Sequence, residues 1–263
     1  MASLDLRRIL AGWEYEPNQI TVRKVTGDDG SIKIQMRLDL GILQMEVSGR
    51  PDGQRPHGFE SLLAYHENRL QKHVDKNGTE LGIELTPDEC QGLREEAVQY
   101  YHRYLAEFVL EDFAGVQRDT ARNLRVLDLC RQSAGEESDR AALEQYRPYL
   151  LMMNTRSQVH LSLRKGAFRK ALTQTEDGLA KIQEVFMEAG QEDAFEEATE
   201  VGILKSLHQE IAARLPVDPM DRLQTELQKA VDEERYEDAI VLRERIDAML
   251  EEKTLAPVKR RKK

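Results

Sequence analysis

The sequence holds little of what membrane proteins and most enzymes need. Only two cysteines, Cys90 and Cys130, occur in 263 residues, and they lack metal-ligand spacing, which favours buried thiols in a reducing cytoplasm. Aromatic residues make up 6% of the chain and charged residues 33%, which suits solvent-washed helices better than a β-rich enzyme. No apolar run reaches the length of a signal peptide or a membrane span, so we expect a cytoplasmic protein.

Motifs for nucleotide, metal and nucleophilic chemistry are also missing. The chain has no GxxxxGK[ST] loop, no GxGxxG at a helix start, and no HExxH or CxxC. The histidines are scattered, and the spacing of His66 and His73 is more typical of a surface pair than of a metal site. We therefore expect no enzymatic activity, no metal and no cofactor. The net charge of −10 argues against broad, non-specific nucleic-acid binding.

Residues 20–47 carry the only clear strand pattern. Apolar and polar residues alternate on both sides of a Gly27–Gly30 turn signal, and the phase of the alternation changes at Gly41. A period of two predicts a sheet with one face in water, where Lys33 and Gln35 should lie. We expect about three antiparallel strands, with a tight turn or bulge at Gly41 and a helix against the apolar face.

From Phe59 onward the apolar residues recur with the helical period. Asn77-Gly78 predicts the end of the first helix, and Thr86-Pro87-Asp88-Glu89 combines a capping box with proline at the first position of the next. Pro148 should kink or split the helix that contains it. Later helices are expected at about 114–134, 139–165, 167–189 and 191–214. The fold class is thus α+β and predominantly α.

The pattern of the last segment, residues 217–252, predicts a helical hairpin. Apolar residues fall on one helical stripe after Asp218, a candidate cap, and the pattern lapses at 232–235 before it restarts at Tyr236. Two helices share a single contact face, so this module cannot hide all its apolar surface by itself. Its remaining edge, Tyr236, Ile240 and Leu250, must pack on the rest of the chain, on a second copy or on another protein.

Residues 234–246, ERYEDAIVLRERI, resemble the UVR motif of the bacterial excision-repair proteins UvrB and UvrC. The motif also occurs in regulators of protein-arginine phosphorylation and in some Clp ATPases. Ile240 stands where a second alanine is usual, and Glu244 where aspartate is usual. The resemblance implies a hairpin that binds another UVR hairpin or a partner protein and performs no chemistry. A hairpin that caps a helical solenoid is the alternative with the same spacing.

A second, shorter resemblance lies in the body of the chain. Residues 164–172, RKGAFRKAL, resemble the inter-helix turn of a tetratricopeptide repeat, and Tyr236-x-x-Ala239-Ile240 echoes Phe168-x-x-Ala171-Leu172. The echo favours stacked antiparallel helix pairs. We expect a helix, sheet and Gly/Pro/Arg loop at 1–58, a helical-repeat body at 59–215, the UVR hairpin at 217–252, and a disordered basic tail at 253–263.

Three interpretations of function stay open. The first is a non-catalytic adaptor, whose partner is another UVR protein, a second copy or an unrelated protein. Its expected contact residues are Leu223, Leu227, Val231, Tyr236, Ala239, Ile240, Ile246 and Leu250, with Arg243 and Arg245 for polar register.

The second interpretation is an accessory nucleic-acid-associated protein of excision repair. The expected phosphate contacts are Lys259, Arg260, Arg261, Lys262 and Lys263. The third is a small-ligand binder or enzyme built on the glycine-, proline- and arginine-rich loop at 49–58, because guanidinium groups bind carboxylates and phosphates bidentately. Its candidate residues are Arg37, Gln44, Glu46, Arg50 and Arg55. The alternative is that this loop has only a structural role, as a rigid corner held by internal ion pairs.

Overall fold

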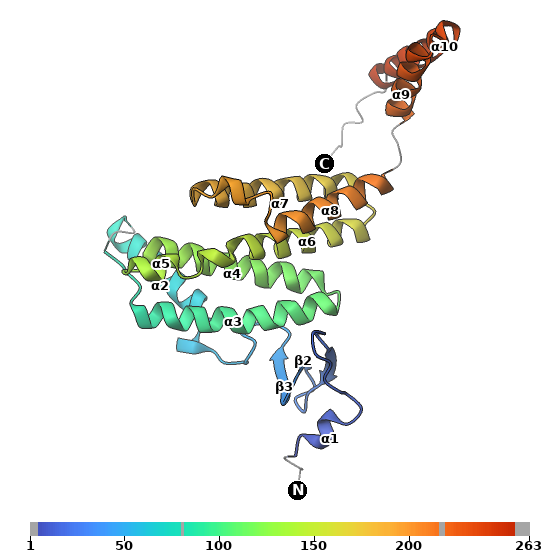
Figure 1. Cartoon of the computed structure of the whole chain (residues 1–263). Helices are drawn as coiled ribbons and strands as arrows, with labels where there is room; N and C mark the ends of the chain where they lie inside the picture. Colours follow the sequence, from blue (N-terminus) through green and yellow to red (C-terminus); the bar gives the residue numbers. More distant parts are fainter. Residues whose placement is uncertain (1–4, 80–81, 216–218, 256–263) are drawn as a thin grey trace. The chain divides into compact units, whose positions relative to one another are not determined.

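The computed structural model describes residues 5–79, 82–215 and 219–255, and its regular structure is mainly helical (Figure 1). The chain divides into two compact units, residues 1–213 and 214–263. The predicted fold class, mostly helical with a small N-terminal antiparallel sheet and a C-terminal hairpin, is confirmed. The helices of the first unit are α1 (Arg7–Leu10), α2 (Leu62–Asn77), α3 (Pro87–Val109), α4 (Phe113–Ser133), α5 (Glu137–Ala141), α6 (Arg147–Arg164), α7 (Phe168–Glu188) and α8 (Thr199–Arg214).

The sheet has the predicted three strands in the order β1 (Val22–Thr26), β2 (Ile32–Leu38) and β3 (Gly41–Glu46), all antiparallel. The first turn is closed by the Gly27 amide, which donates to the Ser31 carbonyl at 2.8 Å. A tight turn before Gly41 joins β2 to β3, as the change of phase predicted. The apolar face packs on the carboxyl-terminal half of α3, where Ile34, Met36 and Met45 surround Ala106. The sheet is thereby fixed to the helical part of its unit.

The expectation that Lys33 and Gln35 face water is wrong, because both side chains are buried. β2 is the central strand, so polar neighbours on both sides cover its second face. The Lys33 amine is 2.9 Å from Asp29 Oδ2 and also contacts Glu46. The Gln35 amide donates to Gln44 and accepts from Arg23, at 2.8 Å in each case. Paired polar groups can be buried at little net cost, and these pairs replace the expected water.

Local signals set several helix ends, and those at Gly78 and at Thr86–Glu89 were predicted. Ser61 caps α2 through a hydrogen bond from the Ala64 amide, and Gly78 ends the helix with φ 72°. At α3 the capping box is complete: Thr86 Oγ1 accepts from the Glu89 amide, and the Thr86 amide donates to the Glu89 carboxylate. These bonds satisfy amide and carbonyl groups that a helix end otherwise leaves unpaired.

Two predicted helices are shorter than expected. The helix expected at 139–165 is divided into α5, a 3₁₀ turn at Glu144–Tyr146, and α6, with Pro148 in the first turn of α6. Proline splits the segment there because it lacks an amide hydrogen and tolerates only the first helical turn. The helix expected at 191–214 begins as a 3₁₀ turn at Glu192–Ala194, and α8 starts only at Thr199.

Three apolar clusters hold the helices of the first unit together. The largest lies among α3, α4, α6, α7 and α8, and contains Tyr104, Val116, Met153, Ile182 and Leu204. A second lies among α2, α3 and α4, and a third joins α6 and α7 to α8. Figure 1 shows α3, α4, α6 and α7 running alongside one another within this unit. The packing gives α3 and α4 a long common face, which carries the polar cluster of the candidate site.

Both cysteines lie in the second apolar cluster and are buried, as predicted. The structure also brings together two thiols that are distant in sequence, because Cys90 of α3 and Cys130 of α4 lie in the same apolar cluster. Burial raises the pKa of the Cys130 thiol to about 12. At that pKa neither ligation nor nucleophilic attack is favoured, since both need the thiolate.

The second unit contains α9 (Pro219–Asp232) and α10 (Tyr236–Leu255), joined by the three residues Glu233–Arg235. The predicted helical hairpin is therefore present. The expected cap at Asp218 lies outside the described residues, and so do residues 256–263 of the basic tail predicted at 253–263. The prediction is wrong for residues 253–255, which continue α10 as helix.

Candidate functional site

The turn of the C-terminal hairpin has a defined backbone geometry. Glu234 adopts the left-handed conformation, with φ 55°. The Arg235 amide donates to the Ala230 carbonyl at 2.7 Å and the Glu234 amide donates to the Val231 carbonyl at 3.0 Å. This is the Schellman arrangement of a helix end, with glutamate where glycine is usual. It reverses the chain within three residues and sets α10 antiparallel to α9.

Small and medium-sized apolar side chains form the seam between the two helices. Ala230 of α9 and Ala239 and Ile246 of α10 are buried, and Leu223 and Leu227 are half-buried. Alanines next to the turn allow the helix backbones to approach closely. The seam thus contains the apolar residues that an isolated helix pair can cover.

A second apolar stripe on α10 is left outside the seam. Tyr236 is 63% exposed, Ile240 60% and Leu250 49%, and their spacing of four and then ten residues places them on one face of the helix. Arg243 falls on the same face and is exposed. We call Tyr236, Ile240 and Leu250 the docking stripe. Apolar side chains gathered on an exposed face are typical of interaction surfaces, so this stripe is the candidate site of the hairpin.

The residues predicted to bind a partner therefore have three different environments. Ala239 and Ile246 are buried in the seam, and Leu223 and Leu227 are half-buried there. The docking stripe is exposed, and so is Val231 of α9, at 44%. Arg243 and Arg245 are both exposed but are two residues apart, so they project from nearly opposite faces of α10.

Val241, which was not among the residues predicted to bind a partner, is 49% exposed and follows Ile240 in the sequence. The helical spacing alone places Val241 on a different face of α10 from Tyr236 and Leu250. A substitution at Val241 can therefore serve as a control for substitutions in the docking stripe.

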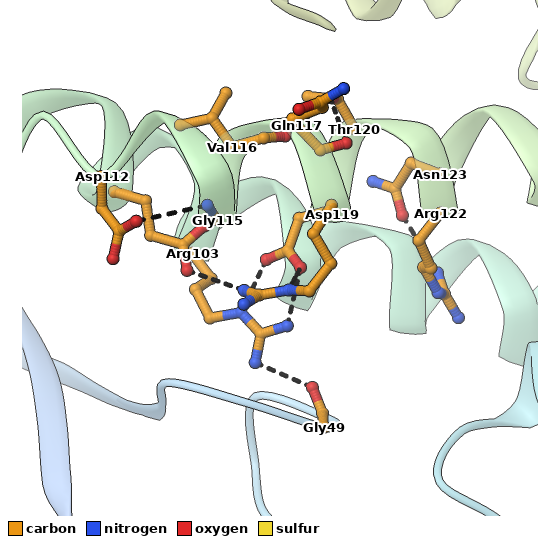
Figure 2. Close-up of polar contacts among 12 residues, drawn as sticks. Gly49, Arg103, Asp112, Gly115, Val116, Gln117, Asp119, Thr120, Arg122 and Asn123 are labelled. Atoms are coloured by element: carbon orange, nitrogen blue, oxygen red, sulfur yellow. Dashed lines mark hydrogen bonds and ion pairs between the residues drawn. The ribbon is translucent and has the colours of Figure 1, made fainter. Parts of the chain in front are cut away.

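A second polar arrangement lies where the loop after β3 meets α3 and α4. Arg103 and Asp119 are both completely buried, and the guanidinium Nε and Nη2 donate to the two carboxylate oxygens at 2.6 and 2.9 Å (Figure 2). The remaining nitrogen, Nη1, donates to the carbonyls of Glu46 and Gly49, at 3.0 and 2.8 Å. One side chain of α3 therefore holds both α4 and the loop.

Further ionised groups extend this cluster. Arg118 of α4 bridges Asp119 and Glu107, at 2.8 and 2.7 Å. Arg122 pairs with Glu96 at 2.7 Å, and its guanidinium lies 4.1 Å from the centre of the Tyr100 ring. A guanidinium over an aromatic face adds cation–π attraction to the ion pair. Every arginine here has a carboxylate partner, so the cluster connects α3 and α4 as an internal fastening.

The protonation of Glu107 is strongly perturbed by its surroundings in this cluster. Burial, together with the charge of Asp119, raises the pKa of the Glu107 carboxyl to about 7. Its Oε2 atom is buried and accepts no hydrogen bond from the described residues. A side chain at Gly115 would overlap this carboxylate, because an added Cβ would lie 2.4 Å from Oε1. The close approach of α4 to Glu107 therefore depends on glycine at 115.

The candidate ligand residues near this cluster separate into two groups. Glu46, Arg50 and Arg55 line one cavity of about 410 Å³ beside the loop. Arg37 lies elsewhere: its guanidinium donates to the carbonyls of Trp13 and Gly41, at 3.0 Å each, and ties the β2–β3 turn to the N-terminal segment.

Gln44 is likewise occupied within the sheet, where its side chain accepts from Gln35. Arg50 pairs with Asp52 at 3.1 Å, which is an ion pair expected if the loop is a rigid structural corner. Only three of the five candidates thus face a common space.

A neighbouring cavity of about 280 Å³ shares Gly49 and Glu60 with the first and is lined by arginines that the sequence analysis did not single out. Three of them, Arg118, Arg122 and Arg125, follow helical spacing along α4. That spacing was the available signal. Apart from Asp119, which follows Arg118 in the sequence, the carboxylate partners come from α2 and α3 and cannot be recognised from the sequence of α4. Within the described residues no group of three or more histidines, cysteines or carboxylates is placed to hold a metal ion. The helices in those residues include none with the length and apolarity to span a membrane.

Comparison with known proteins identifies the hairpin and nothing else in the chain. The model of the UvrB/uvrC motif, UVR, matches residues 219–252, which include the turn, the seam and the docking stripe. No curated protein and no solved structure matches the chain. The protein therefore carries a UVR motif, and that motif is the hairpin of α9 and α10.

Proposed function

We propose that this protein is a non-catalytic adaptor that binds a partner protein through the docking stripe of its UVR hairpin. The observation that carries the proposal is the exposure of Tyr236, Ile240 and Leu250 on one face of a module whose seam buries Ala230, Ala239 and Ile246. An exposed stripe of this kind loses contact with water when a partner covers it, at about 25 cal/mol per Å² of apolar area.

A few residues should contribute most of the binding free energy of the interface. Large side chains at the centre of an interface typically contribute about 2 kcal/mol or more each when truncated, and tyrosine is enriched among them. Tyr236 and Ile240 lie one helical turn apart beside the rigid hairpin turn, so little conformational entropy is lost when they dock. The first unit then serves as the body to which the docking module is attached.

The test is affinity purification from extracts of the native cell with the full chain as bait. The stripe variant carries Tyr236→Ala and Ile240→Ala. The matched control carries Val98→Ala and Met187→Ala, two apolar side chains of similar exposure in the first unit. We expect a protein that is recovered with the wild type and the control and lost with the stripe variant.

Helix content measured by circular dichroism must be the same in all three chains. Recovery of an identical set of proteins with the stripe variant would remove the adaptor proposal. Sedimentation of the same chains at increasing concentration measures whether the partner is a second copy.

The second candidate, an accessory protein of excision repair that contacts nucleic acid, is supported by one sequence feature, the basic run Lys259–Lys263. Five consecutive cations near an acidic module suit contact with phosphates. The cytoplasm is the proposed location for either function, because the two cysteines are free thiols.

A further inference from the structure

The protein contains a second hairpin with the same turn as the UVR hairpin. Residues Lys165–Ala167 join α6 to α7, and Gly166 takes the left-handed position, with φ 68°. The Ala167 amide donates to the Ser162 carbonyl at 2.9 Å, as the Arg235 amide does to Ala230 in the UVR hairpin. The two turns therefore share the left-handed position and the same backbone hydrogen bonds, with a constant offset of 68 positions.

The shared register continues along both helices. Ala171 and Ala239 are buried at equivalent places in the two seams, as are Ser162 and Ala230. Phe168 corresponds to Tyr236 and Leu172 to Ile240. The α6–α7 hairpin is thus an internal template for what should cover the docking stripe.

In that template a third helix covers the equivalent face. Leu207 and Ile211 of α8 pack on Phe168 and Leu172 in a cluster that also holds Val159 and Ala171. Further along, Ile182 of α7 is fully buried in the cluster that α8 joins through Leu204. Figure 1 shows α8 lying along α6 and α7.

The UVR hairpin has no counterpart of α8 among the described residues of its unit. Leu250, which corresponds to Ile182, is half exposed, and Tyr236 and Ile240 are more so. The two hairpins therefore differ mainly in the missing third layer.

We infer that the partner covers the docking stripe with a single basic amphipathic helix, seated as α8 is seated on α6 and α7. This inference rests on the adaptor function and specifies its partner. The α6–α7 hairpin indicates the spacing of apolar residues on the partner helix. Two apolar residues four positions apart, like Leu207 and Ile211, should contact the docking stripe next to the hairpin turn. The charge of the hairpin indicates the composition of the partner helix, because residues 219–252 hold eleven acidic and five basic residues. A helix rich in lysine or arginine complements that excess, whereas a second hairpin repeats it.

The probe is a synthetic peptide with the sequence of α8, residues 199–214, made basic at three exposed positions by S206K, Q209K and E210K. A control peptide also carries L207D and I211D. Binding to the full chain is measured by fluorescence anisotropy at two salt concentrations. The chain is tested as wild type, as Ile240→Asp, and as Val241→Asp, which changes an adjacent exposed residue off the docking stripe.

We expect the basic peptide to bind the wild type and Val241→Asp alike and to bind Ile240→Asp at least tenfold more weakly, which is about 1.4 kcal/mol. The unmodified α8 peptide should bind more weakly than the basic one, and the difference should shrink at high salt. The L207D/I211D control should not bind.

Failure of the basic peptide together with a dimer that Ile240→Asp dissociates would overturn the single-helix inference and leave the adaptor proposal standing, with a second copy as the partner. Equal binding by Ile240→Asp would overturn it too, since the peptide would then sit elsewhere. If neither peptide nor dimer is found, and affinity purification yields no stripe-dependent protein, both proposals fall.

Discussion

Replacing Arg103 with methionine tests whether the buried ion cluster fastens the first unit. The substitution keeps most of the side-chain volume and removes the guanidinium. Among the described residues, Asp119 then keeps only Arg118 as a partner, and the carbonyls of Glu46 and Gly49 lose the Arg103 donor. The change therefore weakens both the α3–α4 contact and the attachment of the loop.

The expected magnitude follows from burial. Removing one member of a buried ion pair costs about 3–5 kcal/mol, because the remaining charge stays away from water. Each carbonyl left without its donor adds on the order of 1 kcal/mol, and these contributions overlap. We expect Arg103→Met to lower the free energy of unfolding by roughly 4 kcal/mol, a large part of the 5–15 kcal/mol that is typical of a domain.

The control is Arg125→Met, which removes a guanidinium from the same face of the unit. Arg125 pairs with Glu67, but the arginine side chain is 58% exposed. Exposed pairs contribute about 0–1 kcal/mol, so this variant should stay close to the wild type. The comparison separates burial of the pair from loss of a charge.

Urea denaturation measures both variants. Fluorescence of Trp13, the only tryptophan, follows the N-terminal region, because Arg23 of β1 lies 4.0 Å from its ring centre, and circular dichroism follows the helices. With a slope of about 2 kcal/mol per M, Arg103→Met should lower the midpoint by about 2 M and Arg125→Met by less than about 0.5 M. Equal shifts for the two variants would refute the reasoning.

Three further predictions concern the cluster, the tail and the loop. Because the folded pKa of Glu107 is raised to about 7, the folded chain holds this proton more tightly than the unfolded chain between about pH 4.5 and 7, so stability from this group falls as pH rises through that window. Glu107→Gln should remove that loss and stabilise the protein at pH 8 by on the order of 2 kcal/mol, measured by urea denaturation at pH 5 and pH 8; parallel pH profiles would contradict it. Deleting residues 259–263 should abolish salt-sensitive DNA binding if the tail contacts phosphate, and flat titrations of the intact chain at low salt would exclude that function. If the 410 Å³ cavity binds small anions, a screen of carboxylates and phosphates should raise the melting temperature of the wild type and not of Arg55→Ala, and no shift in either would dismiss a ligand there.

Much of the local structure is determined by the sequence alone. The capping box at Thr86–Glu89, Gly78 at the end of α2 and Pro148 at the start of α6 act within one helical turn, so short sequence patterns predict them. The alternation in residues 20–47 likewise predicts the three strands, and the lapse at 232–235 predicts the hairpin turn.

Tertiary structure decides which of these residues share an environment. Arg103 contacts Gly49, 54 positions away, only because β3 ends against α3, and Asp119 is its partner only because α3 and α4 pack side by side. Lys33 and Gln35 are buried because neighbouring strands supply polar partners for both. The sequence therefore predicts that the hairpin has surplus apolar surface, but the packing of α9 on α10 decides that Ala239 and Ile246 are hidden and Tyr236 and Ile240 are free. Caps and turns involve neighbours within about four residues, whereas burial depends on which distant elements come together in space.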